Sequence, residues 1–303
     1  MNPRQLKWAA AAMVVAVILW VVSERTAEQP DDRDMRRVLP EQVEGVDRIV
    51  FASPEDTVEL RRTATAWTVN GLEIDNVRLN TLFTALLDST GSEVVATSAA
   101  VHARMGVDGS RTTFTLFRGD EVVATVLFGN NGADESSIYA RNEGNDLVYR
   151  YDGLLTQLVA LGVNDWRSRV LMNVPVEAIA RVAVDRAGIS YALTRQDGSW
   201  VLSSGAAVDT AKVAMMLSRF QPLEARRIAS DEHRDAADFS TPERRITLFD
   251  AAGVVLAALV YDSLGGSGAG FAVRARGDET VYQVPWRTLD QIMPPEEELR
   301  AGN

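Results

Sequence analysis

Two hydrophobic periodicities divide this chain into expected strands and helices. Apolar and polar residues alternate in short runs bounded by turn-forming residues, a pattern typical of half-buried strands. Between Asp75 and Leu87 the spacing changes, because apolar side chains there recur every three or four residues and form the stripe of an amphipathic helix. Asp75 itself is suited to cap that helix. We therefore expect one main helix among strands at residues 47–51, 57–61, 66–70, 93–97, 112–117, 121–128, 138–141 and 147–151.

The turns between these runs predict how the strands pair. Arg118-Gly119-Asp120 separates two apolar runs and is a hairpin signal, and Asn70-Gly71 marks another turn. An apolar segment at residues 154–161 is expected to close the pattern with a short helix. Because short turns connect most consecutive strands, the expected fold class is α+β, an antiparallel sheet with one main packed helix.

The whole pattern occurs twice along the chain. Trp67 and Trp200 each lie in a strand-like run and are 133 residues apart, while Asp75 and Asp209 each precede a helical stripe and are 134 apart. Further blocks upstream and downstream keep the same order. A repeat of this length is the size of a domain. We therefore expect two tandem duplicated domains at residues 41–170 and 171–295, followed by a polar tail at residues 296–303.

A membrane anchor is expected at the N-terminus. Residues 8–22 contain no charged side chain and follow a basic segment, residues 1–7. This favours an uncleaved transmembrane signal-anchor with a cytoplasmic tail, and a cleaved signal peptide is the alternative. Residues 23–40 are polar and are expected to form a tether. The expected location is the cytoplasmic (inner) membrane, crossed once, with the N-terminus inside and the bulk of the chain in the periplasm or extracytoplasmic space.

Charge and cysteine content narrow the candidate functions. Asp and Glu number 42 against 31 Lys and Arg, which gives a net charge of −11. Such a surface repels nucleic acid, so we expect no nucleic-acid partner. The sequence contains no Cys, which excludes disulfides, thiol catalysis and Cys-ligated metals.

No pattern assigns a catalytic, cofactor-binding or metal-binding residue. His102 and His233 have no second His at ligand spacing, and the acidic residues around His233 are interpreted as a solvated segment. The Gly-rich run Gly265–Gly270 precedes a strand-like run rather than Lys-Ser/Thr and a helix, so it predicts a hairpin connection. Paired carboxylates stay open as a hydrolytic alternative, because the distances between them depend on the fold.

Trp166, Arg167 and Arg169 form the main candidate contact site. They lie in a block, Asn164–Leu171, that joins the two repeats and has no counterpart after the second. A Trp flanked by arginines is the composition of a partner-binding site. The alternative, which we favour, is an inter-domain plug in which Trp166 is buried between the repeats and at least one arginine pairs with an Asp or Glu.

Several short motifs also carry a family resemblance. They are Trp67-Thr68-Val69 followed by Asp75, then Gly106-Val107-Asp108, Val148-Tyr149 with Val281-Tyr282, and Trp166–Arg169. Together they resemble an uncharacterised bacterial domain-of-unknown-function family of membrane-anchored proteins, over about residues 40–295. Gly109-Ser110 departs from the proline region of that family, which Thr241-Pro242 keeps in the second repeat.

The resemblance implies a cellular context rather than a reaction. Members are typically encoded beside ABC transporter subunits of the gliding-motility type, and no catalytic residues are assigned to them. We therefore expect a non-enzymatic accessory or scaffold component of an ABC-type transport system, with transporter subunits as partners and no cofactor. An extracytoplasmic binding module for an envelope polymer or peptide is the first alternative, and a carboxylate-based hydrolase is less favoured.

Overall fold

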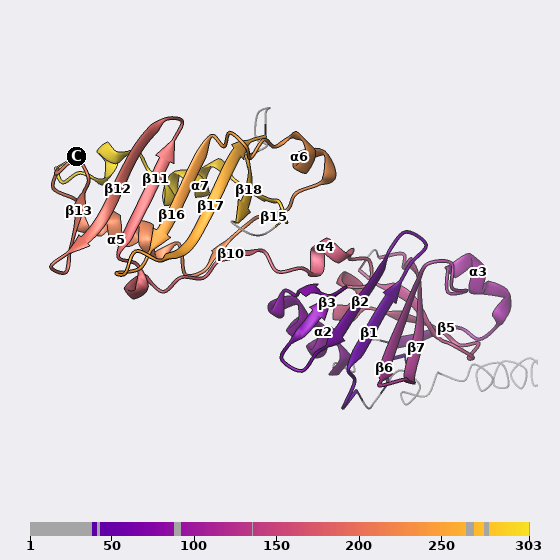
Figure 1. Cartoon of the computed structure of the whole chain (residues 1–303). Coiled ribbons are helices and arrows are strands. Elements are labelled where there is room, and N and C mark those ends of the chain that lie inside the picture. The colour runs from indigo at the N-terminus through magenta and orange to yellow at the C-terminus, as the bar shows by residue number, and fades with distance from the viewer. Residues whose placement is uncertain are drawn as a thin grey trace, which may run out of the picture. The chain divides into compact units, whose positions relative to one another are not determined.

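The chain folds into two compact units, which a computed structural model describes at residues 38–40, 43–87, 92–134, 136–264, 270–275 and 279–302 (Figure 1). The first unit ends at Trp166 and the second begins at Arg167. We expected the boundary after residue 170. It falls earlier because β10 (Val170–Met172) pairs with β14 (Leu223–Glu224) and so belongs to the second unit.

A nine-stranded antiparallel sheet forms the first unit, in the order β4-β3-β2-β1-β6-β7-β8-β9-β5. Helix α2 (Asn76–Leu87) buries Leu79, Leu82, Ala85 and Leu86 against the core of this unit. Its strands are β1 (Arg48–Ala52), β2 (Thr57–Arg62), β3 (Trp67–Val69), β4 (Leu72–Glu73), β5 (Ser92–Ala96), β6 (Thr112–Arg118), β7 (Glu121–Asn131), β8 (Ile138–Asn142) and β9 (Val148–Tyr151). Short helices are η2 (Ala99–Val101), α3 (His102–Met105), η3 (Leu154–Gln157) and α4 (Val163–Trp166).

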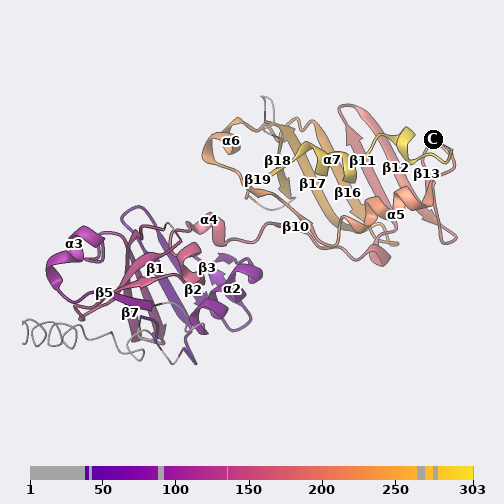
Figure 2. The same cartoon turned by 180° about the vertical axis from the view of Figure 1, so that it is seen from behind.

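An eight-stranded antiparallel sheet forms the second unit, in the order β13-β12-β11-β16-β17-β18-β19-β15. Helices α5 and α7 lie on one face of it, in front of the strands in Figure 2. Its strands are β11 (Arg181–Arg186), β12 (Ile189–Gln196), β13 (Ser199–Leu202), β15 (Arg227–Ile228), β16 (Arg244–Phe249), β17 (Val255–Ser263), β18 (Phe271–Ala275) and β19 (Tyr282–Val284). Its helices are η4 (Val176–Ala178), α5 (Thr210–Ser218), α6 (Asp231–Ala236), α7 (Trp286–Ile292) and η5 (Glu296–Leu299).

The two sheets share one strand order. Setting β1, β2 and β3 against β11, β12 and β13, β5 against β15, and β6–β9 against β16–β19 matches them strand for strand, with β4 left over. The register agrees as well, since Trp67 pairs with Arg62 and Trp200 with Arg195. The two Trp residues therefore occupy equivalent strands, as the sequence pattern predicts. A register shift also falls at the same point of β6 and β16.

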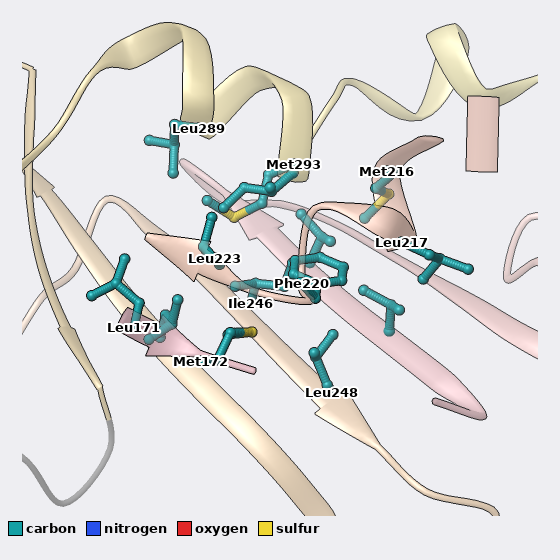
Figure 3. Packing of buried hydrophobic residues seen from close by; sticks show 14 of the residues in the cluster. Leu171, Met172, Met216, Leu217, Phe220, Leu223, Ile246, Leu248, Leu289 and Met293 are labelled. Carbon is teal, nitrogen blue, oxygen red and sulfur yellow. The ribbon is translucent and has the colours of Figure 1, made fainter. Parts of the chain in front are cut away.

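Each unit has its own hydrophobic core. In the second unit, side chains of α5 and α7 meet those of the sheet (Figure 3). Figure 3 shows Met216 and Leu217 of α5, Leu289 of α7, and Ile246 and Leu248 of β16 gathered there. The first core is built in the same way, from α2 and the buried face of the first sheet. The predicted combination of an antiparallel sheet with few helices is therefore present in both units.

Three expectations at the ends of the units need correction. The tail at residues 296–303 is part of the second fold rather than an appendage, because Leu299 is buried in its core. Val38, placed in the tether, is buried in the first core. The closing helix expected at residues 154–161 is shorter and forms only the 3-10 turn η3.

The expected anchor at residues 8–22 lies outside the described residues. No helix within the described ranges combines the length and the apolar character needed to cross a membrane.

Candidate functional site

Asp75 and Asp209, the acidic landmarks of the repeat, are helix N-caps. Asp75 Oδ1 accepts hydrogen bonds from the N–H groups two and three residues later, at 2.9 and 3.2 Å. Asp209 Oδ1 does the same at 3.0 and 3.2 Å. These carboxylates satisfy N–H groups that have no partner inside the helix. Both residues therefore have a structural role at the starts of α2 and α5.

Trp166 is fully buried, but it is buried within the first core. Its ring stacks on Phe51 with 5.6 Å between centroids, and its carbonyl accepts a hydrogen bond from the Asp75 N–H at 2.8 Å. The second unit repeats this bond, from the Asp209 N–H to the carbonyl of Leu299 at 2.8 Å. Contrary to our expectation, the junction block has a counterpart, the segment that contains η5. Trp166 closes the first unit as Leu299 closes the second.

Arg167 and Arg169, by contrast, belong to the second unit and form hydrogen bonds within it. Arg167 Nη2 donates to Thr280 Oγ1 at 2.8 Å, and Arg169 Nη1 donates to the carbonyl of Arg226 at 3.1 Å. Pairing of either arginine with an acid stays a prediction. The structure therefore separates the three candidate residues, and buried Trp166 offers no surface to a partner.

Both histidines form hydrogen bonds within their own unit. His102 Nε2 lies 3.0 Å from the carbonyl oxygen of Asp146, and His233 Nδ1 lies 2.9 Å from Ser230 Oγ at the start of α6. Within the part of the chain that the structure describes, no three His, Asp or Glu side chains are grouped as metal ligands. The Gly-rich connection at residues 265–269 lies outside the described residues.

Two equivalent turns, one in each unit, were not predicted from the sequence. Asp108 Oδ1 accepts from the N–H and hydroxyl of Ser110 at 3.1 and 2.5 Å, and Asp238 Oδ1 accepts from those of Ser240 at 2.9 and 2.6 Å. Thr241 Oγ1 also donates to Asp238, at 2.8 Å. These hydrogen bonds lower the pKa of Asp238 to about 2. The shared Asp-x-Ser spacing was the available signal.

In each sheet, the face opposite the hydrophobic core is covered only in part. In the first unit, the connection through α3 packs over β8, where Arg141 Nε donates to the Val107 carbonyl at 2.9 Å. In the second, the connection through α6 contributes Ala229 to a small cluster that includes Ala272, with Phe239 packed against it. The side chains of β1, β2 and β6, and those of β11, β12 and β16, that point away from the core stay exposed or half-buried. We call these surfaces the first and second open faces.

On the first open face the arginines are paired with an acid. Arg61 donates two hydrogen bonds to the carboxylate of Glu59, at 2.8 and 3.1 Å. Arg48 Nη1 lies 3.9 Å from the same carboxylate, and its guanidinium lies 3.5 Å from the centroid of the Phe117 ring. The hydrogen bonds from Arg61 hold the pKa of Glu59 below its usual value.

On the second open face the same positions are filled differently. Arg181 is equivalent to Arg48 and lies over Phe249, 5.1 Å from its centroid. The strand pairings place Ala192 where the first unit has Glu59, and Arg245 where it has Thr113. A trough of about 340 Å³ results, lined by Arg181, Ala183, Val184, Asp185, Ser190, Tyr191, Ala192, Ser203, Arg245 and Thr247. Its chemistry is that of a surface site for an anion.

The comparison with known families places the chain. The family described as "Domain of unknown function (DUF4340)" matches residues 67–242, more than half of the chain. The match starts at Trp67 in β3 and ends just before β16, so it includes parts of both units. No curated protein and no solved structure matches the chain. The chain therefore belongs to the DUF4340 family, a domain of unknown function.

Proposed function

We propose that this chain is a membrane-anchored extracytoplasmic scaffold subunit of an ABC-type transport system and carries out no chemistry of its own. Its two units are two copies of one domain, a proposal supported by the common strand order and register. The apolar run at residues 8–22 supplies the anchor. The resemblance described above supplies the transporter context.

One observation carries this proposal, the repeated open face. A sheet normally covers one face with its core and leaves the other to water or to a partner. Here the uncovered part of each sheet presents exposed or half-buried side chains, so one chain offers two separate contact surfaces. Two surfaces on one tethered chain suit a subunit that holds other subunits together, because linked contacts raise the effective concentration of each partner.

Site-directed crosslinking tests the scaffold function. A photo-crosslinker at Thr115, on the first open face, is expected to capture a transporter subunit in membranes solubilised with mild detergent. The matched control places the crosslinker at Asn80, on the exposed side of α2. Equal capture from both positions, or capture of no transporter subunit from the first, would contradict the proposal.

Fusions test the anchor separately. Alkaline phosphatase fused after Asn303 is expected to be active, because the C-terminus would lie outside the cytoplasm, and a cytoplasmic reporter at the same position is expected to be silent. The reverse pair of results would contradict the orientation. A mature N-terminus between Ser23 and Ala27 would replace the anchor with a cleaved signal peptide.

A further inference from the structure

The two open faces differ in charge pairing although they share a fold. On the first, Glu59 forms ion pairs with both Arg61 and Arg48. On the second, Ala192 replaces that carboxylate, and the side chains of Arg181 and Arg245 form no ion pair or hydrogen bond with any residue that the structure describes. The first open face therefore serves as a comparison, because its arginines form ion pairs within their own unit.

We propose that the second open face binds an anionic polysaccharide, with Arg181 and Arg245 each pairing to a carboxylate or phosphate group of the sugar chain. Arginine binds both groups through two parallel hydrogen bonds. This proposal goes beyond the scaffold function and does not depend on the transporter. It names the location and the ligand chemistry of a site that would serve contact with an envelope polymer.

The spacing of the arginines indicates a polymer rather than a small anion. Arg181 lies opposite Phe249, and Arg245 lies opposite Asp185, four positions further along β11. At about 3.3 Å per residue, the two arginines are roughly 13 Å apart along the strands. With the Arg181 guanidinium held over the Phe249 ring, a single phosphate or carboxylate beside it would leave Arg245 to reach across most of that spacing. A chain with repeated charges can contact both arginines at once, and the second contact then gains from a high effective concentration.

The floor of the trough suits a sugar chain. Ala183 and Ala192 leave the space between the arginines open, and Thr247, Ser190 and Ser203 bring hydroxyl groups to it. The Ser203 hydroxyl accepts a hydrogen bond from the Ala192 N–H at 3.0 Å, which leaves its own proton to donate. Small side chains with several hydroxyls can meet the many hydroxyls of a saccharide without a deep pocket.

Two other polyanions fit this surface less well. Single-stranded nucleic acid is bound on exposed aromatic rings. Among the residues lining the trough only Tyr191 has a ring, and it is buried, with its hydroxyl donating to the Pro294 carbonyl at 2.6 Å. The half-buried Phe249 ring beside the trough lies under the Arg181 guanidinium. Extended peptides add to the edge of a sheet, but β11 and β16 each have a neighbouring strand on both sides.

Asp185 is the counter-charge within the site. It faces Arg245 across the β11–β16 pair, and its Oδ1 accepts a hydrogen bond from the Gly188 N–H at 3.3 Å. A carboxylate here opposes the binding of an anion. Removing its charge should therefore strengthen binding, which gives the proposal a gain-of-function test.

Calorimetric titration of the purified full-length chain tests the proposal. Alginate oligosaccharides carry repeated carboxylates, phosphomannan oligosaccharides carry repeated phosphates, and dextran carries no charge. We expect one or both charged sugars to bind and dextran not to bind, and the two charged arms identify the preferred anion. Arg181→Ala and Arg245→Ala should each raise the Kd about tenfold, the loss of one charge-assisted contact.

Three more variants make the test specific. Arg48→Ala removes the equivalent, already paired arginine and should leave the Kd unchanged. Ala192→Glu restores the carboxylate of the first open face and should abolish binding by pairing with Arg181, while Asp185→Asn should lower the Kd severalfold. Arg245 is exposed and its side chain forms no hydrogen bond or ion pair with a described residue, so its replacement should keep the fold intact, which a thermal melt checks.

Clear results would overturn the proposal. They are binding to neither charged sugar, equal binding of dextran, an equal loss in Arg48→Ala and Arg181→Ala, or full binding retained in Ala192→Glu. A thymidine oligonucleotide or polyglutamate that binds more tightly than either sugar would also overturn it, and would redirect the site to that class of polymer.

Discussion

At the scale of single residues, the buried side chain of Trp166 and the carboxylate of Asp238 lead to separate predictions about stability. Trp166 is fully buried, so Trp166→Ala should lower the free energy of unfolding of the first unit by about 3 kcal/mol, the scale for emptying an aromatic site. The matched control is Trp286→Ala, because Trp286 is 55% exposed and its loss should cost little. Urea unfolding of the full chain measures both, and equal losses would contradict the role of Trp166.

Trp166→Phe refines this prediction. The indole Nε1 of Trp166 has no hydrogen-bond partner among the described residues. Phenylalanine removes that buried donor and keeps most of the contact with Phe51, so the substitution should cost about 1 kcal/mol. A loss as large as that of Trp166→Ala, in the same urea unfolding measurement, would mean that the indole nitrogen is satisfied in the folded protein.

Asp238 predicts a pH dependence. Hydrogen bonds from Ser240 and Thr241 lower its pKa from 3.8 to about 2. A lowered folded-state pKa stabilises the fold above the unfolded-state pKa, and that stabilisation is lost as the pH falls through the folded-state pKa. The melting temperature should therefore fall between about pH 4 and pH 2, and less steeply in Asp238→Asn. Identical acid profiles for the two proteins would contradict this assignment.

At the scale of elements, the caps of α2 and α5 should behave alike. Asp75→Ala and Asp209→Ala remove the same pair of hydrogen bonds from two equivalent helices. Each should cost about 1 kcal/mol, and asparagine at either position should restore most of it. Hydrogen exchange of the first-turn amides measures each helix within the intact chain. A loss confined to one helix would show that the two starts are not equivalent.

The repeated pattern predicted most elements because periodicity reports which face of a strand or helix is buried. The strands, the main helix of each unit and the equivalent positions of Trp67 and Trp200 follow from it. The equivalence of the two closing segments was not predicted. Trp166 and Leu299 share only their burial and a hydrogen bond to their carbonyl group, and neither feature can be recognised from residue type. The acidic residues before Leu299 also gave this segment a polar composition, so it was predicted to be an exposed tail.

The candidate site was beyond sequence reasoning for a different reason. Arg181 and Arg245 are 64 positions apart in the chain and meet on one face only through the pairing of β11 with β16. Whether an arginine is paired depends on the residue across the strand, Glu59 in one unit and Ala192 in the other. Periodicity predicts the face of a side chain but not its neighbours.

At the scale of the whole molecule, the separate cores predict separate unfolding. Every residue of the first core precedes Arg167 and every residue of the second core follows it. Leu299 is 1% exposed and belongs to the second core, so Leu299→Ala should destabilise the second unit by about 2–5 kcal/mol. Trp166→Ala should act on the first unit alone. Sites in different cores share no contacts, so the two effects should be independent.

Calorimetry of four proteins tests this independence: the natural chain, the two single variants and the double variant. We expect two transitions, with Trp166→Ala lowering one and Leu299→Ala lowering the other, and the double variant showing both shifts unchanged. Removal of residues 302–303 is the control and should move neither transition, because it keeps the hydrogen bond from the Ala301 N–H to the Ala207 carbonyl at 2.9 Å. A single transition that both substitutions lower would instead mean that the two units unfold as one cooperative body, because the loss of either core would then be felt throughout the chain.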